Sequence, residues 1–222
     1  MTDPAFTAVA APPPGAVVLF DGTNLDAWTA RRGGGPARWP LTEDGAMVAD
    51  GGDIMTRARF ADFYLHLEFA CNDTPPHVTG QGRGNSGVFL QGRYEIQVLD
   101  SWRAAEEPPR DPPGKGDCGA IYNHAAPLVN ACLPPEVWQS YDIVFRAPRF
   151  GAAGEKVEGA RITAFQNGRV IHNNVEVPRQ TGGALDEDYA QPGPLLLQDH
   201  GNPVRFRNIW ILPLPSAGAD HY

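Results

Sequence analysis

Apolar and polar residues alternate with a period of two along most of the chain. In residues 63–69 every odd position is apolar, and in residues 93–98 the apolar Tyr94, Ile96 and Val98 alternate with polar side chains. This period is typical of strands that bury one face. Similar alternation, or short apolar runs, predicts further strands at residues 17–20, 46–48, 88–91, 141–146, 161–165, 169–172, 195–197 and 204–212.

One pair of these strands is predicted to form a hairpin. Asn167 and Gly168 separate residues 161–165 from residues 169–172. An Asn-Gly pair favours a type I′ turn because both central residues of that turn need a positive φ. The two strands should therefore be antiparallel neighbours.

About ten strands without a helical period longer than two turns predict an all-β fold. The 25 Gly and 22 Pro residues indicate many turns and exclude a helical bundle. We expect a two-sheet antiparallel β-sandwich, a jelly roll, in which the Gly/Pro-rich loops at residues 74–83, 101–117 and 181–193 wall a cleft. The predicted organisation is a flexible N-terminal segment (residues 1–15), a single domain (residues 16–213) and a C-terminal tail (residues 214–222).

Charge and hydropathy narrow the classes of partner. Eighteen basic and 26 acidic residues give a net charge of −8, which argues against nucleic acid as a partner. No apolar run is long enough to span a membrane, and the first 15 residues lack the features of a signal peptide. We expect a cytoplasmic protein by default, or a periplasmic one if a signal was trimmed. Cys71, Cys118 and Cys132 are expected to be reduced thiols. The oligomeric state stays open.

The segment around Glu95 carries the most chemistry. Glu95 and Gln97 share one strand face, and a bulge or strand end would bring Asp100 to the same side. The spacing Glu-x-Gln-x-x-Asp resembles the Glu-x-Asp-x-x-Glu strand of lectin-like jelly-roll glycosidases. It departs from that pattern because Gln97 cannot ionise and Asp100 is shorter than Glu. The alternative is a strand that merely exposes polar side chains.

A glycine-rich motif precedes one strand. Residues 82–87 fit the pattern GxGxxG, but a dinucleotide site needs a strand before the motif and a helix after it. A loop precedes this motif and a strand at residues 88–91 follows it. We therefore expect a turn from which Asn85 presents its amide to a cleft.

Further candidate residues lie on loops and at strand ends. His200 follows an acidic residue and suits acid/base work or metal binding. Arg205 and Arg207 share a strand face and could hold an anionic oxygen or pair with carboxylates. Lys115 lies in a loop that could cover a cleft, and Trp102 could stack on a sugar ring. No closely spaced His pair is present, so a metal site would need ligands from separate strands.

A set of motifs follows in order along the chain. They are LFDGTNLDAW (19–28), NSGV (85–88), YEIQVLD (94–100), CGAIY (118–122), WQSYDI (138–143), NG (167–168), LQDHG (197–201) and RNIWI (207–211). Taken together, these motifs identify the chain as similar to the 3-keto-disaccharide hydrolase family, over about residues 17–212. The resemblance implies a concanavalin-like jelly roll and an enzyme, a hydrolase or lyase, that cleaves glycosides whose glucose ring is oxidised at C3.

The implied chemistry needs no second carboxylate. A C3 ketone acidifies the C2 proton, so a base can remove it while the C1 leaving group departs, and water can then add to the enone. Such a site needs a base, an acid and a group that stabilises the enolate. The acid/base candidates are Glu95, Asp100 and His200. Lys115, Arg205 or a divalent metal (Ca²⁺, Mn²⁺ or Mg²⁺) would hold the enolate, although no cofactor is certain. The substrate-binding candidates are Asn85, Gln97, Trp102, Tyr122, Arg205 and Arg207.

Two other functions stay open. A conventional retaining glycosidase would have Glu95 and Asp100 about 5–5.5 Å apart. A non-catalytic carbohydrate-binding module would bind sugar without cleaving it, since fold alone does not determine function. All three readings share a small carbohydrate as the ligand.

Overall fold

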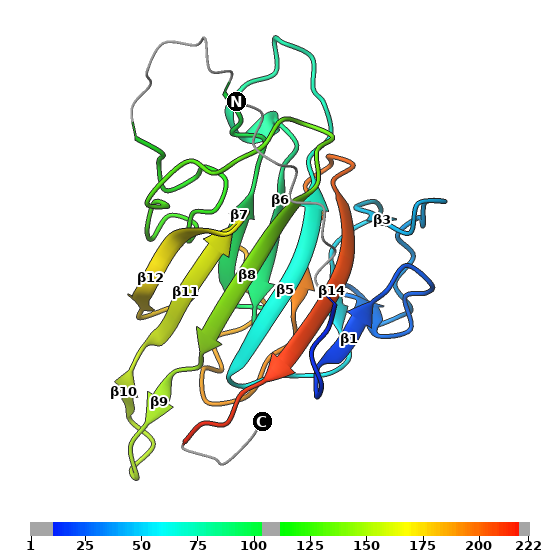
Figure 1. Cartoon of the computed structure of the whole chain (residues 1–222). Coiled ribbons are helices and arrows are strands. Elements are labelled where there is room, and N and C mark those ends of the chain that lie inside the picture. Colours follow the sequence, from blue (N-terminus) through cyan, green and yellow to red (C-terminus); the bar gives the residue numbers. More distant parts are fainter. Residues whose placement is uncertain (1–10, 104–111, 218–222) are drawn as a thin grey trace.

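The computed structural model describes residues 11–103 and 112–217 (Figure 1). The predicted N-terminal segment and C-terminal tail lie partly outside these residues. The described part contains one short 3₁₀ helix, η1 (Gly80–Gly82), and fourteen strands. These are β1 (Val17–Phe20), β2 (Trp28–Ala30), β3 (Met47–Val48), β4 (Ile54–Thr56), β5 (Phe63–Ala70), β6 (Ser86–Leu90), β7 (Tyr94–Val98), β8 (Gln139–Arg146), β9 (Arg149–Phe150), β10 (Lys156–Glu158), β11 (Ala160–Gln166), β12 (Arg169–Val177), β13 (Leu196–Leu197) and β14 (Arg205–Pro213).

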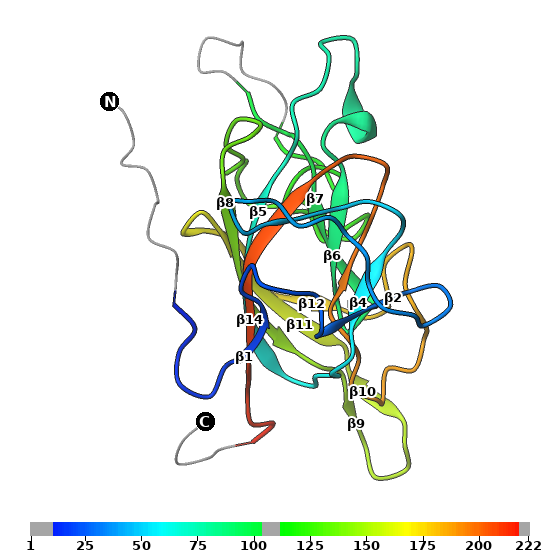
Figure 2. The same cartoon turned by 90° about the vertical axis from the view of Figure 1, so that its right-hand side faces the viewer.

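The strands form two stacked sheets, which Figure 2 shows from the side. One sheet has seven strands in the order β1-β14-β5-β8-β11-β12, with β3 also paired to β14, and the other has five in the order β2-β4-β13-β6-β7. A separate hairpin joins β9 and β10. All pairings are antiparallel. The fold is the expected all-β sandwich of the jelly-roll class.

The core fills the space between the two sheets. On β5 the odd-numbered residues Phe63, Leu65, Leu67 and Phe69 are at most 1% exposed and belong to the main apolar cluster. On β7 the inward residues are Tyr94, Ile96 and Val98. The outward residues of β7 are then Glu95 and Gln97, because successive side chains point to opposite faces.

The alternation predicted most strands but missed the shortest ones. The longest predicted segments match β5, β7, β8, β11, β12 and β14, and a strand follows the glycine-rich motif as expected. In the predicted hairpin Asn167 and Gly168 have φ values of 52° and 73°, as a type I′ turn requires. Strands β2, β4, β9 and β10 were not predicted, because two or three residues are too few to display a period.

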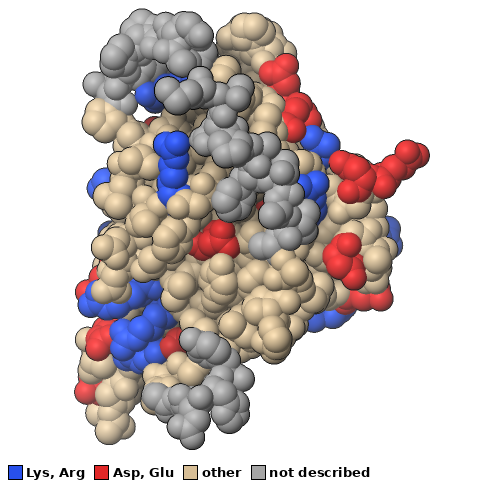
Figure 3. All heavy atoms as spheres, in the orientation of Figure 1, with Lys and Arg blue, Asp and Glu red and all other residues tan. Residues whose placement is uncertain are grey.

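Three smaller findings complete the fold. The three cysteines form no disulfide, as expected. In the described residues, no helix has the length and apolar character needed to cross a membrane. On the face shown in Figure 3, basic and acidic side chains are intermixed. Several arginines of the described residues pair with carboxylates, such as Arg149 with Asp62 and Arg161 with Glu176.

Candidate functional site

A small cavity opens at one end of the five-stranded sheet, on the side facing away from the core. We call it the reaction cavity, and its volume is about 210 Å³. Strand β7 supplies Glu95 and Gln97, and the chain just before β6 supplies Asn85. The segment after β13 supplies His200, so neighbouring strand ends converge here. The lining residues are Gln81, Asn85, Glu95, Gln97, Tyr122, Gly182, Gly183, Gln198 and His200.

Glu95 is the most perturbed group in this cavity. It is 3% exposed, and its carboxyl group makes no hydrogen bond or ion pair with any described residue. Burial, together with the negative charge of nearby Asp53, raises the pKa of Glu95 from 4.5 to about 8. Its backbone is fixed, because Thr181 Oγ1 accepts a hydrogen bond from its N–H and Tyr122 N–H donates to its carbonyl. The backbone of Glu95 is therefore held in place, and its carboxyl group is mainly protonated at neutral pH.

A glycine on the neighbouring strand makes room for this carboxyl group. Gly87 pairs with Gln97 in the β6–β7 register, and a Cβ atom at Gly87 would lie 2.4 Å from Glu95 Oε1. Any side chain at this position would displace the carboxyl group. The glycine-rich motif before β6 thus has a steric role beside Glu95.

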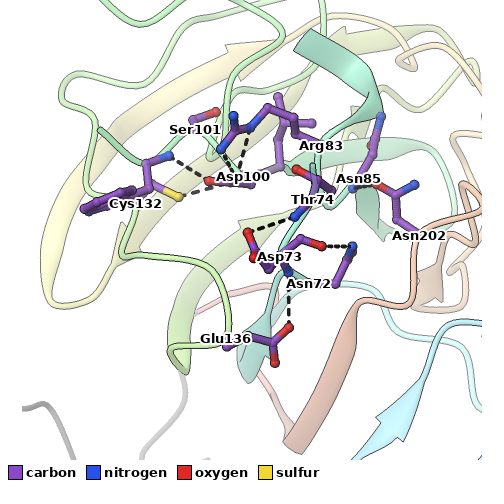
Figure 4. Close-up of polar contacts among 12 residues, drawn as sticks. Asn72, Asp73, Thr74, Arg83, Asn85, Asp100, Ser101, Cys132, Glu136 and Asn202 are labelled. Carbon is purple, nitrogen blue, oxygen red and sulfur yellow. Dashed lines mark hydrogen bonds and ion pairs between the residues drawn. The ribbon is translucent and has the colours of Figure 1, made fainter. Parts of the chain in front are cut away.

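A chain of amide groups forms one wall of the cavity. Gln97 Nε2 donates to Asn85 Oδ1 (2.9 Å), and Asn85 Nδ2 donates to the Gln81 carbonyl (2.7 Å). Gln81 Nε2 in turn donates to the carbonyl of Gly116 (2.8 Å). Asn202 Oδ1 accepts from the backbone N–H of Asn85 at 2.8 Å and anchors its loop (Figure 4). This wall is rigid and polar but carries no charge.

Three other side chains that line the cavity, unlike the amide wall, have no hydrogen-bond partner among the described residues. Tyr122, Gln198 and His200 make no side-chain hydrogen bond with any described residue, and His200 is exposed while the other two are half-buried. Their polar groups are available to a ligand. The cavity therefore combines one buried acid, an ordered amide wall and three unengaged polar groups.

Comparison with known proteins identifies the family. Residues 15–212 match the model of the 3-keto-alpha-glucoside-1,2-lyase-like domain. The chain belongs to this family. The 3-keto-disaccharide hydrolase resemblance predicted from the motifs is thereby confirmed.

Solved structures agree with this assignment. A glycosyl hydrolase candidate from Parabacteroides distasonis is 39% identical, with a TM-score of 0.75, over 91% of this chain and 85% of that one. Two more glycosyl hydrolase candidates from the same organism are 21% and 22% identical and share the fold. Their TM-scores are 0.62 and 0.59, over 90% of this chain and 94% and 99% of theirs. A search of curated proteins gave no significant match.

In this member of the 3-keto-glucoside lyase-like family, the cavity contains five of the ten residues that were predicted for the site. They are Asn85, Glu95, Gln97, Tyr122 and His200. Four lining residues were not predicted. Gln198 lies in a motif used for the resemblance and could have been included, whereas Gln81, Gly182 and Gly183 come from loops whose position the sequence does not reveal.

Asp100 is predicted to face the same side as Glu95, but it lies outside the lining of the cavity. Strand β7 ends at Val98, and the Asp100 side chain is fully buried against Arg83, whose Nε donates to it at 3.0 Å (Figure 4). Its other oxygen accepts from the backbone N–H of Trp102 at 3.1 Å. The Trp102 side chain is 37% exposed and does not line the cavity either.

Arg205 and Arg207 do share a face, as predicted, but on the other sheet. Both guanidinium groups lie over the Trp138 ring, Arg205 pairs with Glu136, and Arg207 pairs with Glu68 on β5. They face away from the core on the seven-stranded side, so neither lines the reaction cavity.

Lys115 is nearer to the cavity than these arginines but is not part of its lining. It is exposed on a loop, and the next residue, Gly116, contacts two lining residues, Gln81 and Tyr122. A role for the Lys115 ammonium group at the rim stays a prediction.

A divalent metal ion at this cavity stays a prediction. Within residues 11–103 and 112–217, no group of three or more His, Cys, Asp or Glu side chains could hold an ion. Ca²⁺, Mg²⁺ and Mn²⁺ favour several oxygen ligands, usually with more than one carboxylate. Among the described residues, Glu95 is the one carboxyl group that lines this cavity. No step below is therefore assigned to a metal.

Proposed function

We propose that this protein cleaves the glycosidic bond of 3-keto-glucosides by elimination, with or without later addition of water. Support comes from its family, from its 39% identity to a glycosyl hydrolase candidate and from the chemistry of the reaction cavity. The observation that carries the proposal is Glu95, a buried carboxyl group that has no partner among the described residues and is the one carboxylate among those that line the cavity.

Glu95 is proposed as the general acid. With a pKa of about 8 it carries its proton at neutral pH and can give it to the departing glycosidic oxygen. Burial favours this transfer in a second way, since few water molecules compete for the proton. As the pH rises above 8, Glu95 ionises and this function is lost.

His200 is proposed as the base. Its neutral imidazole would take the proton from C2, which the C3 ketone acidifies. The electrons of the C2–H bond form the C1=C2 double bond, the C1–O bond breaks, and the leaving oxygen takes the proton of Glu95. The products are an enone and a free alcohol, so atoms and charge balance.

The uncharged polar groups would bind the sugar and its developing negative charge. Tyr122 and Gln198 have unengaged donors that can hydrogen-bond the C3 oxygen as it becomes enolate-like. Asn85 and Gln97 are already ordered by each other, so they can bind ring hydroxyls with little loss of side-chain entropy.

The same geometry disfavours a conventional retaining glycosidase. That mechanism needs two carboxyl groups about 5–5.5 Å apart, one of them ionised as the nucleophile. Gln97 takes the position of a second acid on β7, and Asp100 is engaged by Arg83. Glu95 itself is mainly protonated at neutral pH and is a poor nucleophile in that state.

The test compares 4-nitrophenyl glucosides, of both anomers, before and after oxidation at C3. We expect release of nitrophenol from the oxidised substrate alone. E95Q and H200A should each lower kcat by about 10²–10⁴-fold, as expected for loss of an acid or base. E43Q and H77A, which change exposed residues outside the cavity, are the matched controls.

Deuterium at C2 separates elimination from direct displacement. A primary isotope effect is expected on nitrophenol release, and H200A should abolish exchange of the C2 hydrogen with solvent. Equal cleavage of the unoxidised glucoside would indicate a glycosidase instead. Binding without cleavage would indicate a carbohydrate-binding module.

A further inference from the structure

Beside the reaction cavity lies a larger hollow that the proposed reaction has not used. It consists of two cavities of about 530 Å³ and 450 Å³, both lined by Ala30, Arg32, Gly51 and Gly52. We call the two together the arginine cavity. Cβ atoms at Gly51 or Gly52 would meet nothing within 4 Å, so the space in front of this wall is open.

The arginine cavity adjoins the reaction cavity. Asp199 lines the arginine cavity, and the next residue, His200, lines the reaction cavity. Asp53 also lines the arginine cavity, and it is near enough to Glu95 for its charge to raise the pKa of that group. A substrate whose sugar ring lies against Glu95 and His200 can therefore extend its leaving group into the arginine cavity.

The residues between the two cavities are committed to structural contacts. Arg31 Nη1 pairs with Asp53 Oδ2 at 2.9 Å, and Arg31 Nη2 donates to the carbonyl of Ala184 at 3.1 Å, directly after Gly182 and Gly183 of the reaction cavity. The two Asp199 oxygens accept backbone N–H groups from Gly52 and Gly201. These hydrogen bonds connect the segments that separate the two cavities, so Arg31 and Asp199 have few donors or acceptors left for a ligand.

Two arginines in the arginine cavity differ from most others in the chain. Arg32 and Arg38 are exposed, line the same cavity, and make no hydrogen bond or ion pair with any described residue. Other arginines, such as Arg83 and Arg93, are paired with carboxylates. Asp50 lines the cavity as well and offsets one of the two charges. Two unengaged guanidinium groups supply planar arrays of donors that match an anionic oxygen group.

We propose that the arginine cavity binds the leaving group of the substrate, and that Arg32 and Arg38 select a leaving group that carries an anionic oxygen substituent such as a carboxylate. This inference rests on the proposed function, because it assigns the part of the substrate beyond the scissile bond. The anion sits beyond the reacting atoms, so its recognition affects specificity and not the chemical step.

The experiment uses two 3-keto-glucosides that differ only in a remote charge. Their leaving groups are 4-(carboxymethyl)phenol and 4-(carbamoylmethyl)phenol, in which a methylene group isolates the charge from the phenolic oxygen. We expect the protein to prefer the carboxylate, and the double variant R32A/R38A to lower kcat/KM for the carboxylate about tenfold, as two exposed charge pairs would. For the amide the change should be less than about twofold.

Two further variants sharpen the result. R179A removes another exposed arginine without a described partner, located outside the cavity, and should leave both substrates unchanged. D50N removes the opposing charge and should increase the preference for the carboxylate. High salt should reduce this preference in the wild type, because the guanidinium groups are exposed.

The outcomes distinguish this inference from the proposed function. Activity on both substrates with no preference, or an equal loss on both in R32A/R38A, would overturn the anion selection alone. Inactivity of the wild type on both 3-keto substrates would overturn the proposed function and this inference with it. A selective loss on the carboxylate, with an unchanged melting temperature, supports the proposal.

Discussion

Each sheet carries a buried glutamate on the side facing away from the core, and the two carboxyl groups have opposite surroundings. Glu95 lies on β7 of the five-stranded sheet, and Glu68 lies on β5 of the seven-stranded sheet. Their exposed fractions are similar, 3% and 7%. Desolvation raises the pKa of both groups, so burial alone cannot explain why their pKa values move in opposite directions.

Glu68 is surrounded by donors. Arg207 Nε donates to it at 2.6 Å and Asn208 Nδ2 at 3.0 Å, while His66 Nε2 lies 3.8 Å away. Burial raises the pKa of Glu68, but the nearby His66 and the hydrogen bonds from Asn208 and Arg207 outweigh it and lower the pKa to about 2. Burial lowers the pKa of His66, yet the hydrogen bond to Asp142 and the negative charge of nearby Glu68 raise it to about 9. The cluster is a closed network of opposite charges.

Glu95 is buried, but no described residue donates a hydrogen bond to its carboxyl group. Its pKa therefore moves in the opposite direction, to about 8. A buried carboxyl group with all its partners stabilises the fold and has no proton to give near neutral pH. A buried carboxyl group without partners makes the folded protein less stable when the group is ionised, so the group keeps a proton that it can give to a ligand. The contrast supports the proposed chemistry on the five-stranded side of the molecule and a structural role for the cluster around Glu68 on the seven-stranded side.

The largest expected effect is the loss of stability in E68Q. Arg207 and the charged His66 would lose their shared carboxylate, and we expect the free energy of unfolding to fall by about 3 kcal/mol at pH 7. The Glu68 contribution is present above pH 4.5, its unfolded pKa, and is lost as the pH falls towards 2. The His66 contribution is present below pH 6.5 and is lost as the pH rises through about 9.

Urea unfolding of wild type and E68Q between pH 4 and pH 9.5 measures this difference. It should be greatest between about pH 5 and pH 7 and shrink at both ends. A difference that does not vary with pH would mean that Glu68 acts by packing alone, and the proposed contrast in electrostatics would fail. E43Q, at an exposed position, controls for the general effect of removing a negative charge.

The same substitution at Glu95 should have the opposite sign. The pKa of Glu95 is raised above its unfolded value of 4.5, so stability is fully present below pH 4.5 and decreases until the pH passes about 8. E95Q removes the ionisable group and should increase the free energy of unfolding at pH 8.5. At pH 4.5 the two proteins should be equally stable.

Thermal unfolding at these two pH values gives the check. A variant that is inactive but more stable at pH 8.5 would link the missing partners of Glu95 directly to its function. Destabilisation by E95Q at pH 8.5 would indicate that the ionised carboxyl group has a stabilising partner. The proposed difference between Glu95 and Glu68 would then be wrong.

These two glutamates also show how far sequence reasoning extends. Alternation with period two is a local property, so it correctly placed Glu95 and Gln97 on one outward face and Arg205 and Arg207 on another. It could not tell that these faces belong to opposite sides of the sandwich, because that depends on which strands join which sheet. The pairing of Arg207 with Glu68 joins residues 139 positions apart.

The candidate site was predictable where motifs named its residues and unpredictable where loops completed it. His200 and Tyr122 lie in motifs shared with the family, and the structure brings both to the reaction cavity. Asp100 lies outside the lining of the cavity and is hydrogen-bonded to Arg83, which comes from another loop that the sequence pattern does not place. Gln81 has no signal of its own, since its place in the amide wall arises only when η1 and the 112–117 loop meet.

The smallest expected effect tests whether Asp53 contributes to the unusual state of Glu95. D53N keeps an oxygen that can accept the hydrogen bond from Asp199 N–H but removes the negative charge, and it leaves the charge of Arg31 uncompensated. Both changes favour the ionised form of Glu95, so its pKa should fall. Because Glu95 must be protonated to act as the acid, the alkaline limb of kcat/KM should move from about pH 8 to lower pH. We expect a shift of about half to one pH unit.

The measurement is the pH profile on the uncharged 4-(carbamoylmethyl)phenyl 3-keto-glucoside. D50N is the control, because it removes a neighbouring charge that has no described contact with Asp53, Arg31 or Asp199. An unmoved limb would leave burial as the sole cause of the raised pKa, and a shift to higher pH would contradict the assignment of Glu95 as the acid.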